Sequence, residues 1–553
     1  RGEFGALLRA NSPLEGGQGG VTDDNFNPDC SFFSKTGNFR ITHGSNTFAI
    51  APSRSADGKT RLAINSHQPW EGPAAWYEAH LKSEEGWDMV GGLFPGSPVI
   101  LHGHNRHLGW AHTVNRPDLI DVYVLEINPD NPEQYKFDGE WQELDIRETP
   151  IRVKLFGPFY WTVKREVLWS IHGPVVRQPH GTYAIRIAGY GRIRQIEQWY
   201  RMNKAQNFSE WQEAMRIGAM PMFNTGYADK DGNIFYIYNG LLPKRAEGYD
   251  WSKYLPGNSS ETIWDEYLPF EKLPQVNNPL SGFIQNCNSS PFRTTIGPGN
   301  PDSASYTSTY GIETRMTNRS LRALELFGFD ESITPDEFYA YKFDIKYSKK
   351  SAMAGILRKL LDVSAPQDSL LQNALDELKG WELRTDKQST GAALAVLSFQ
   401  RYFSANLDTL QTSTLLARLK KTARKLQQKF DRLDVPWGDV NRLIRGEVDL
   451  SLDGGPDVLR AVYGRLRDDG RLQGSAGDCY VLLVEWDQDG TVHSQSVHQY
   501  GSATLDQTSP HYADQTELFA NLKMKPVWIN EAEIRANLEA EYRPGERKNS
   551  NRE

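Results

Sequence analysis

Cysteine is scarce in this 553-residue chain, which contains only Cys30, Cys287 and Cys479. Three widely spaced cysteines exclude a disulfide scaffold and a cysteine-based zinc cluster, and leave room for one disulfide at most. No uninterrupted apolar run approaches the roughly 18 residues that a membrane-spanning helix needs, so we expect no membrane partner. Positive charge is not in excess, because 62 Lys and Arg face 70 Asp and Glu and the net charge is −8. We therefore expect no nucleic-acid partner, since phosphate neutralisation needs a basic surface.

Aromatic residues, in contrast, are abundant: the chain has 15 Trp, 24 Tyr and 24 Phe, and 39% of its residues are hydrophobic. This composition can bury a large core and argues against intrinsic disorder. The length exceeds that of one ordinary domain, so we expect a composite fold or a few packed units. An enzyme or a carbohydrate-type binding protein is the class that remains.

The character of the sequence changes along the chain and predicts four regions. Residues 1–44 begin without Met or an apolar leader and are rich in Gly, Asn, Asp and Ser, which is typical of a linker or propeptide from a longer translation product. Residues 45–310 contain short alternating runs and hairpin turns, such as Asp-Lys-Asp-Gly within 227–240, and are predicted to be mainly sheet. Residues 311–470 are predicted to be mainly helical, and 471–553 return to strands before a polar tail.

Helical periodicity is clearest where apolar residues recur at three- and four-residue intervals. The segments with this pattern are 319–329, 351–363, 369–381 and 413–433. The Lys- and Arg-rich part of the last segment alternates with apolar residues, which favours a solvated helical face over a site for an acidic partner.

The segment His43-Gly44-Ser45-Asn46 lies between the linker-like region and the first predicted strand. A serine that begins a chain can act as a self-contained catalyst, because its α-amine, with a pKa of about 7.7–8.0, can serve as base for its own hydroxyl. Gly44 permits strained backbone geometry, and Ser45 could attack its carbonyl in a self-cleaving N→O acyl shift. Gly-Ser-Asn is also a common turn, so this segment alone leaves both interpretations open.

Ordered sequence blocks accompany this segment along the rest of the chain. They are GSNTFAI, LAINSHQPW, FPGSPVILHGHNRHLGWAHTVN, SIHGPVV, YADKDGNIFY, NCNSSP, PWGDVNR, GDCYVLLVEW and YGSATLDQTSPHYADQ. With these blocks the chain resembles the penicillin acylase family of N-terminal-nucleophile (Ntn) amidohydrolases, and especially its acyl-homoserine-lactone and aculeacin acylase branch. The resemblance runs from residue 45 to about residue 545.

The resemblance implies an α+β fold, the αββα sandwich of Ntn hydrolases with a large helical insertion. It implies a zymogen that cuts itself between Gly44 and Ser45, and an acylase that hydrolyses the amide of N-acylated small molecules, such as acyl-homoserine lactones or other long-chain acyl amides. A β-lactam acylase and a non-catalytic binding protein with the same fold are the alternatives. The resemblance further implies an α-chain from the same precursor as partner, a periplasmic location, and roles in quorum quenching or antibiotic resistance.

The resemblance also assigns roles to individual residues. Ser45 is the nucleophile and His67 orients it. Asn288 and the backbone N–H of Val114 donate to the oxyanion, where two preorganised donors suit a tetrahedral intermediate. Arg315 positions the asparagine and the amine, although Arg319 and Arg322 lie close by in sequence. Candidates for the wall of the acyl pocket are Trp70, Trp76 and Phe94, for which core packing is an equally good explanation.

This chemistry requires no cofactor. Asp118 and Asp121 fall where calcium-binding members of the family carry aspartates, and hard oxygen ligands suit calcium, so a structural calcium ion stays open. A histidine-rich run at His102, His104, His107 and His112 suggests metal ligation by its density, but no cysteine or carboxylate completes the spacing. Cys287 stands next to Asn288, where a small buried side chain is a better explanation than a thiol nucleophile.

Overall fold

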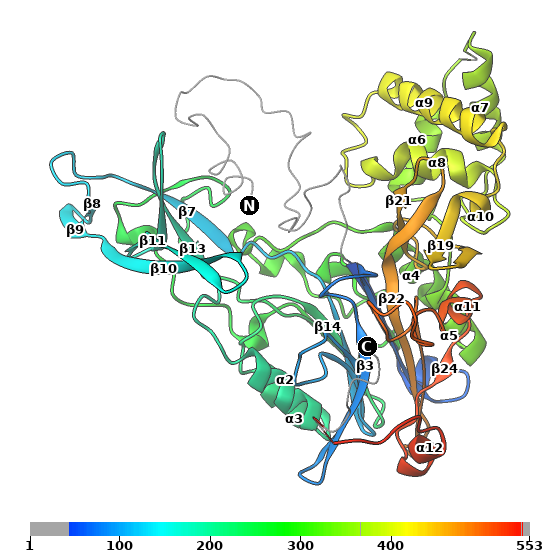
Figure 1. Ribbon diagram of the computed structural model, residues 1–553, viewed down its shortest axis with the longest axis horizontal. Coiled ribbons are helices and arrows are strands. Elements are labelled where there is room, and N and C mark those ends of the chain that lie inside the picture. The colour runs from blue at the N-terminus through cyan, green and yellow to red at the C-terminus, as the bar shows by residue number, and fades with distance from the viewer. Residues whose placement is uncertain (1–43, 365, 544, 546–553) are drawn as a thin grey trace.

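The computed structural model describes residues 44–364, 366–543 and 545. The predicted linker or propeptide at 1–44, apart from Gly44, and Cys30 therefore lie outside the described residues. Within them the architecture is α+β (Figure 1). Most of the helices lie between Asn318 and Val440, and strands lie before and after this segment. None of the described helices is both long and apolar enough to cross a bilayer.

The first sheet contains the strand that begins at Gly44. Its strands follow the order β18-β1-β2-β22-β19-β20, while β21 and β23 also pair with β22, and β24 pairs with β23. Every residue of β1 (GSNTFAI) is buried, because the strand pairs on one side with β18 and on the other with β2. The strands are β1 (Gly44–Ile50), β2 (Thr60–Pro69), β18 (Phe283–Asn286), β19 (Asn441–Arg445), β20 (Val448–Ser451), β21 (Val462–Leu466), β22 (Leu472–Trp486), β23 (Val492–His498) and β24 (Lys525–Pro526).

A second sheet, in the order β17-β15-β14-β6-β5-β4-β3, packs against the first. Ala49, Ile64 and Leu482 of the first sheet share one hydrophobic cluster with Trp110 and Tyr227 of the second, and helices α2 and α3 add to this cluster. The predicted hairpin at 227–240 is confirmed by the antiparallel pair β14 and β15. The elements are β3 (Tyr77–Ser83), β4 (Trp87–Leu93), β5 (His102–His104), β6 (Leu108–Thr113), β14 (Asn224–Asp229), β15 (Ile234–Tyr238), β17 (Gln275–Asn277), α2 (Gln195–Lys204) and α3 (Phe208–Met215).

Helices α4 and α5 cover β1 through aromatic side chains, with the rings of Phe48 and Phe327 4.9 Å apart. Thr334 and Glu337 form a capping box at the start of α5, where Pro335 occupies the first turn. Each of the four segments with clear helical periodicity contains a helix, which confirms those predictions. The helices are α4 (Asn318–Phe329), α5 (Pro335–Lys342), α6 (Ala352–Leu361), α7 (Ser369–Lys379), α8 (Gly391–Phe399), α9 (Thr412–Phe430), α10 (Trp437–Val440), α11 (Thr516–Ala520) and α12 (Glu531–Ala536).

A third sheet, in the order β10-β11-β12-β13-β7-β16, lies at the opposite side of the molecule from α6–α10 (Figure 1). It contains the long hairpin of β10 and β11, and a short ribbon of β8 and β9 lies nearby. The strands are β7 (Ile120–Leu125), β8 (Gln134–Phe137), β9 (Glu140–Glu143), β10 (Asp145–Phe156), β11 (Phe159–Ser170), β12 (Gly173–Gln178), β13 (Gly181–Ile187) and β16 (Leu255–Pro256).

Candidate active site

Ser45 is the second residue of β1 and lies directly opposite Ser66 of β2. Gly44 and Ser45 are consecutive residues at the start of this strand. The Ser45 hydroxyl donates to the carbonyl oxygen of Gly44 at 2.5 Å, which places Oγ beside the carbonyl that the sequence predicts it to attack. The backbone N–H of Ser45 donates to Asn288 Oδ1 at 2.7 Å.

Gly44 is enclosed by three of the side chains that surround this bond. A Cβ atom at this position would lie 2.9 Å from Asn288 Oδ1, 3.2 Å from His67 Nδ1 and 3.3 Å from a guanidinium nitrogen of Arg319. These distances are shorter than ordinary van der Waals contacts, so a side chain larger than glycine would displace polar groups of the site.

Asn288 follows the end of β18 and adopts a left-handed backbone conformation with a φ of 60°. Its N–H donates to Asn286 Oδ1 at 3.0 Å, which fixes the turn, and its Nδ2 donates to the carbonyl of Val114 at 2.8 Å. Its Oδ1 accepts from Ser45 and from Arg319, so the amide orientation is set by donors on one side and an acceptor on the other. The two predicted oxyanion donors, Val114 and Asn288, therefore lie side by side.

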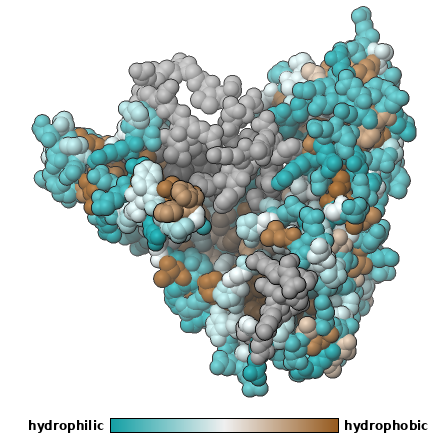
Figure 2. Space-filling model, in the orientation of Figure 1, coloured by the Kyte–Doolittle hydropathy of each residue, from teal (hydrophilic) through white to brown (hydrophobic). Residues whose placement is uncertain are grey.

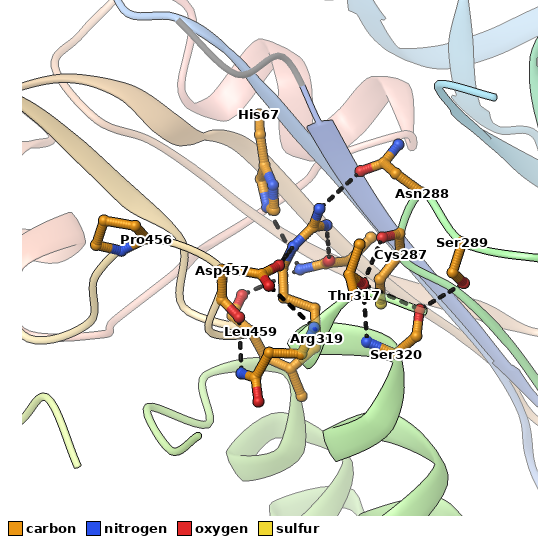
Figure 3. A network of polar contacts seen from close by, with 12 residues as sticks. His67, Cys287, Asn288, Ser289, Thr317, Arg319, Ser320, Pro456, Asp457 and Leu459 are labelled. Atoms are coloured by element: carbon orange, nitrogen blue, oxygen red, sulfur yellow. Dashed lines mark hydrogen bonds and ion pairs between the residues drawn. The ribbon is translucent and has the colours of Figure 1, made fainter. Parts of the chain in front are cut away.

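Arg319 connects the site residues, as Figure 3 shows. Its guanidinium donates to the carbonyl of Ser45 at 2.7 Å, to Asn46 Oδ1 at 2.8 Å and to Asn288 Oδ1 at 2.9 Å. Its Nε donates to Asp457 at 3.2 Å, and that carboxylate balances the buried charge. The contact with Asn288, which the sequence prediction assigned to Arg315, is made by Arg319.

The correction from Arg315 to Arg319 follows from where helix α4 begins. Thr317 caps the helix: its hydroxyl accepts from the N–H of Ser320 and donates to the carbonyl of Cys287 at 2.9 Å. Arg319 therefore lies in the first turn, beside the residue that precedes Asn288. Arg315 lies before the cap, is exposed, and donates to the hydroxyl of Ser404.

His67 lies opposite Gly44 in the register of β1 and β2 and is fully buried. Its Nε2 is 3.0 Å from Asp478 Oδ1 and 3.0 Å from Asn65 Oδ1, and Asn46 Nδ2 lies 3.3 Å away. We assign the ring hydrogen to Nε2, because Asn46 Nδ2 already donates to Asn65 Oδ1 and to the carbonyl of Leu459. Nδ1, which lacks a partner, then carries a lone pair near Gly44. Burial lowers the pKa of His67 to about 4, so the imidazole is neutral at pH 7.

Asp478 at the other end of His67 is a site residue that sequence reasoning missed. Its Oδ2 is 2.9 Å from Lys342 Nζ and 3.1 Å from Arg460 Nη1, and all of these side chains are buried. Burial alone would raise the pKa of Asp478, but Lys342, His67 and Arg460 together hold it well below its ordinary value. In the sequence, Asp478 stands directly before the apolar run CYVLLVEW. This position could have indicated a site residue, because a carboxylate that is buried with such a run needs charged or polar partners.

The three candidates for the acyl-pocket wall differ in how deeply they are buried. Trp70 is 1% exposed, packs edge-on against Tyr500 and Phe519, and donates its indole N–H to the carbonyl of Asp478. It therefore belongs to the core behind the site. Phe94 and Trp76 are both partly exposed, and their ring centroids lie 4.3 Å apart with an interplanar angle of 31°.

Asp118 Oδ1 and Asp121 Oδ1 are buried and have no hydrogen-bond partner, so a structural calcium ion at these carboxylates stays a prediction, although a guanidinium lies against the other Asp121 oxygen. Arg245 donates to Asp121 Oδ2 at 2.9 Å and to the carbonyl of Asp118 at 3.0 Å, and Trp264 donates to the same Asp121 oxygen at 2.7 Å. A calcium ion needs six to eight oxygen ligands and repels a guanidinium. Across the described residues, no group of three or more His, Cys, Asp or Glu side chains forms a metal-binding cluster, and the histidine-rich run is included in that result.

Burial raises the pKa of the Cys287 thiol to about 12, which fits the predicted packing role better than a nucleophile. Cys287 and Cys479 are both free thiols. A disulfide between them is therefore absent within the described chain.

Buried neutral histidines predict that the protein loses stability in mild acid. Burial lowers the pKa of each below the 6.5 of an unfolded chain: to about 4 for His67, His104 and His498, and to about 3 for His102 and His112. The unfolded state therefore takes up protons first, so stability is complete above pH 6.5 and falls as the pH drops towards 4, by up to about 1.4 kcal/mol per pH unit for each histidine.

Urea unfolding midpoints measured between pH 7 and 4.5 should show this decline. His104→Gln should flatten it, because His104 is buried and bonded to Ser494. His493→Gln, at an exposed position, should leave the slope unchanged. Equal slopes for all three proteins would contradict the prediction.

Comparisons with known proteins match most of this chain. The penicillin amidase family model matches residues 6–536. An acyl-homoserine lactone acylase PvdQ from Pseudomonas fluorescens is 25% identical over 558 residues, covering 90% of this chain and 70% of the relative, and one from Pseudomonas putida is 26% identical, covering 91% and 70%. Penicillin G acylase from Escherichia coli is 32% identical over 251 residues, which cover 45% of this chain and 29% of that protein.

Among solved structures, a thermostable penicillin G acylase from Alcaligenes faecalis superposes with a TM-score of 0.66. The superposition covers 90% of this chain and 99% of that one, at 18% sequence identity. At this identity the likeness is one of fold.

Proposed function

The chain belongs to the penicillin amidase family, and from that premise we propose that it hydrolyses the amide bond of N-acylated small molecules with Ser45 as nucleophile. The observation that carries the proposal is the Ser45 hydroxyl at the carbonyl of Gly44, with Asn288 and Arg319 bonded to the same residue. A nucleophile next to a carbonyl, with fixed polar partners, is the arrangement that acyl transfer requires.

The first step of the proposed mechanism is self-cleavage. Ser45 Oγ bonds to the carbonyl carbon of Gly44, the C–N bond to Ser45 breaks, and the nitrogen takes up the hydroxyl proton. Water then hydrolyses the resulting ester, which leaves a carboxylate on Gly44 and an α-amine on Ser45. His67 Nδ1, neutral and aimed at this bond, is placed to accept a hydrogen bond from the new amine.

In the processed enzyme the amine accepts the Ser45 hydroxyl proton while Oγ attacks the substrate carbonyl. The backbone N–H of Val114 and Nδ2 of Asn288 stabilise the oxyanion, and the second of these donates to the Val114 carbonyl in the structure. The amine then protonates the leaving group, and water releases the acyl group by the reverse route. All of these groups belong to the protein, so the proposed reaction requires no cofactor.

The finer architecture and assembly are part of the same proposal. The two packed sheets, with α2 and α3 against one and α4 and α5 against the other, support the αββα sandwich of Ntn hydrolases. The helical insertion, predicted at 311–470, would then be limited to α6–α10, because α4 and α5 pack on β1 and β19, β20 and β21 belong to the first sheet. An α-chain cut from the same precursor completes the pocket, and the enzyme acts in the periplasm.

Acyl-homoserine lactones or other long-chain acyl amides are the proposed substrates, because the PvdQ relatives align over most of this chain. A β-lactam acylase is the second candidate, favoured by the 32% identity to penicillin G acylase over a shorter region. Initial rates on acyl-homoserine lactones of increasing chain length, compared with penicillin G, distinguish the two. Hydrolysis of neither amide by processed protein would refute the proposed function and favour a non-catalytic binding protein.

Arg319→Lys is expected to slow self-cleavage and amide hydrolysis by about 10²-fold, because one ammonium cannot hold Ser45, Asn46 and Asn288 together. Arg315→Lys is the matched control and should behave like the wild type. The fraction of cut chain, measured by intact mass against time, gives the result. If Arg315→Lys were the slower variant, the assignment of Arg319 would fail.

A further inference from the structure

The hairpin of β10 and β11 leaves most of its side chains in solvent. Both strands are twelve residues long, and nearly every residue in the halves nearest the turn is exposed. Figure 1 shows the hairpin in the third sheet, away from the candidate active site in β1 and α4. Its large exposed hydrophobic side chains are Ile151, Val153, Leu155, Phe156, Phe159, Tyr160 and Trp161.

Strand pairing places Arg152, Lys154 and Lys164 on one face of this hairpin, and Arg165, opposite Thr149, on the other. Val153 lies opposite Trp161, so these two side chains share one face. Lys154 lies opposite Tyr160 on the other face, where the guanidinium of Arg152 stacks 4.5 Å from the Tyr160 ring centroid. The hairpin is therefore an amphipathic ribbon, and among the described residues no second sheet or helix packs along the face of Val153 and Trp161.

Side chains also change in character with distance from the turn. Phe156 and Phe159, 68% and 57% exposed, form the tip with ring centroids 5.1 Å apart. Trp161, 60% exposed, follows, and Lys154 and Lys164 stand about 7 Å and 17 Å behind the tip at the rise of a strand. Figure 2 shows hydrophobic surface among hydrophilic surface over this part of the molecule. Peripheral segments insert their apolar part about 5–10 Å into a bilayer, which matches the apolar tip.

The charge of this segment differs from that of the chain as a whole, which carries −8. Residues 150–165 contain no acidic residue, and their basic residues are Arg152, Lys154, Lys164 and Arg165. Lys164 pairs with Glu148, which lies further from the tip, at 2.7 Å.

An anionic lipid surface fits both features, because acyl chains accept the apolar tip while headgroups attract the basic residues behind it. We propose that the tip of the β10–β11 hairpin inserts into the anionic surface of a lipid bilayer. A groove on another protein would not require apolar side chains at the tip and basic side chains behind it, so this order favours a bilayer surface.

The proposal concerns the surface of a bilayer and is independent of the proposed catalytic function. The absence of long apolar runs led us to expect no membrane partner, but that criterion detects spanning helices only. In the hairpin, apolar and basic residues alternate along the sequence, so the mean hydropathy of the segment stays low. Successive residues of a strand point to opposite faces, so the folded ribbon nevertheless gathers apolar side chains together.

Cosedimentation of the purified protein with phosphatidylcholine vesicles that contain or lack phosphatidylglycerol tests this proposal. We expect binding to the vesicles with phosphatidylglycerol and weaker binding as salt rises. Phe156→Ser combined with Phe159→Ser, and separately Arg152→Glu combined with Lys154→Glu, should each reduce the bound fraction by about tenfold or more.

Leu280→Ser and Phe329→Ser are matched controls, because both side chains are highly exposed and lie outside the hairpin. These controls should bind vesicles as the wild type does, and circular dichroism should show that every variant is folded. Equal binding to both kinds of vesicle, or binding that survives the change at the tip, overturns the proposal. So does light scattering that shows self-association, or association with the proposed α-chain, lost only in the tip variant, because the tip would then be a protein interface.

Discussion

Replacing Ser45 with alanine is expected to stop self-cleavage and to lower amide hydrolysis by about 10⁴-fold or more, the scale seen when a nucleophile is removed from an acyl-transfer enzyme. The hydroxyl is the group that touches the Gly44 carbonyl, and the described side chains around it supply no second hydroxyl at that carbonyl. Intact mass and N-terminal sequencing should find an uncut chain. Activity assays on the same sample should find almost no turnover.

Ser66→Ala is the control, because Ser66 lies directly opposite Ser45 on the neighbouring strand and is equally buried. It should leave cleavage complete and most of the activity in place. A Ser45→Ala protein that still hydrolyses amides would mean that another group is the nucleophile. A wild-type protein that remains uncut yet active would refute the role of the α-amine.

Replacing Asp478 with alanine is expected to lower the free energy of unfolding by about 3–5 kcal/mol, since it leaves buried charges without a counter-ion. Lys342 and Arg460 are at most 1% exposed, and both bond to the Asp478 carboxylate. His67 would lose one of the two acceptors near its Nε2, so the processed variant should also be slower. Urea unfolding at pH 7 measures the first effect, and kcat measures the second.

Asp449→Ala serves as the comparison, because Asp449 also pairs with two arginines but lies at the surface of the same sheet. Exposed pairs contribute only about 0–1 kcal/mol, so this variant should unfold close to the wild type. Equal losses of unfolding free energy in the two variants would show that burial does not determine how much these ion pairs stabilise the protein. Asp478→Asn should lie between the two, because it keeps the shape of the side chain and removes its charge.

Local sequence patterns predicted the secondary structure best. The helices at 319–329, 351–363, 369–381 and 413–433 follow from apolar spacing alone, and the hairpin at 227–240 from its turn residues. The pairing of β1 with both β2 and β18 could not be derived in this way, because Phe283–Asn286 lies more than two hundred residues away along the chain. Non-local pairing is decided by the packing of the whole core.

Site residues were predictable where a motif fixes them and unpredictable where packing does. Ser45, His67 and Asn288 lie in short family blocks, and the structure brings them together around Gly44. Arg319 replaces Arg315 because a helix cap sets which arginine points inward. Trp70 looked like a pocket residue, but aromatic rings serve cores and pockets equally, and only the surrounding residues distinguish the two.

The position of Ser45 within β1 bears on the entropy of catalysis. The ends of a polypeptide usually fray, and fixing one residue costs about 1–2 kcal/mol of backbone conformational entropy. After a cut at Gly44, Ser45 would be a chain end, yet β1 would still lie between β18 and β2, with Thr47 opposite Asn286 on one side and Ile64 on the other. The ordering of the nucleophile is thus completed once, when the protein folds, and does not recur with each substrate molecule.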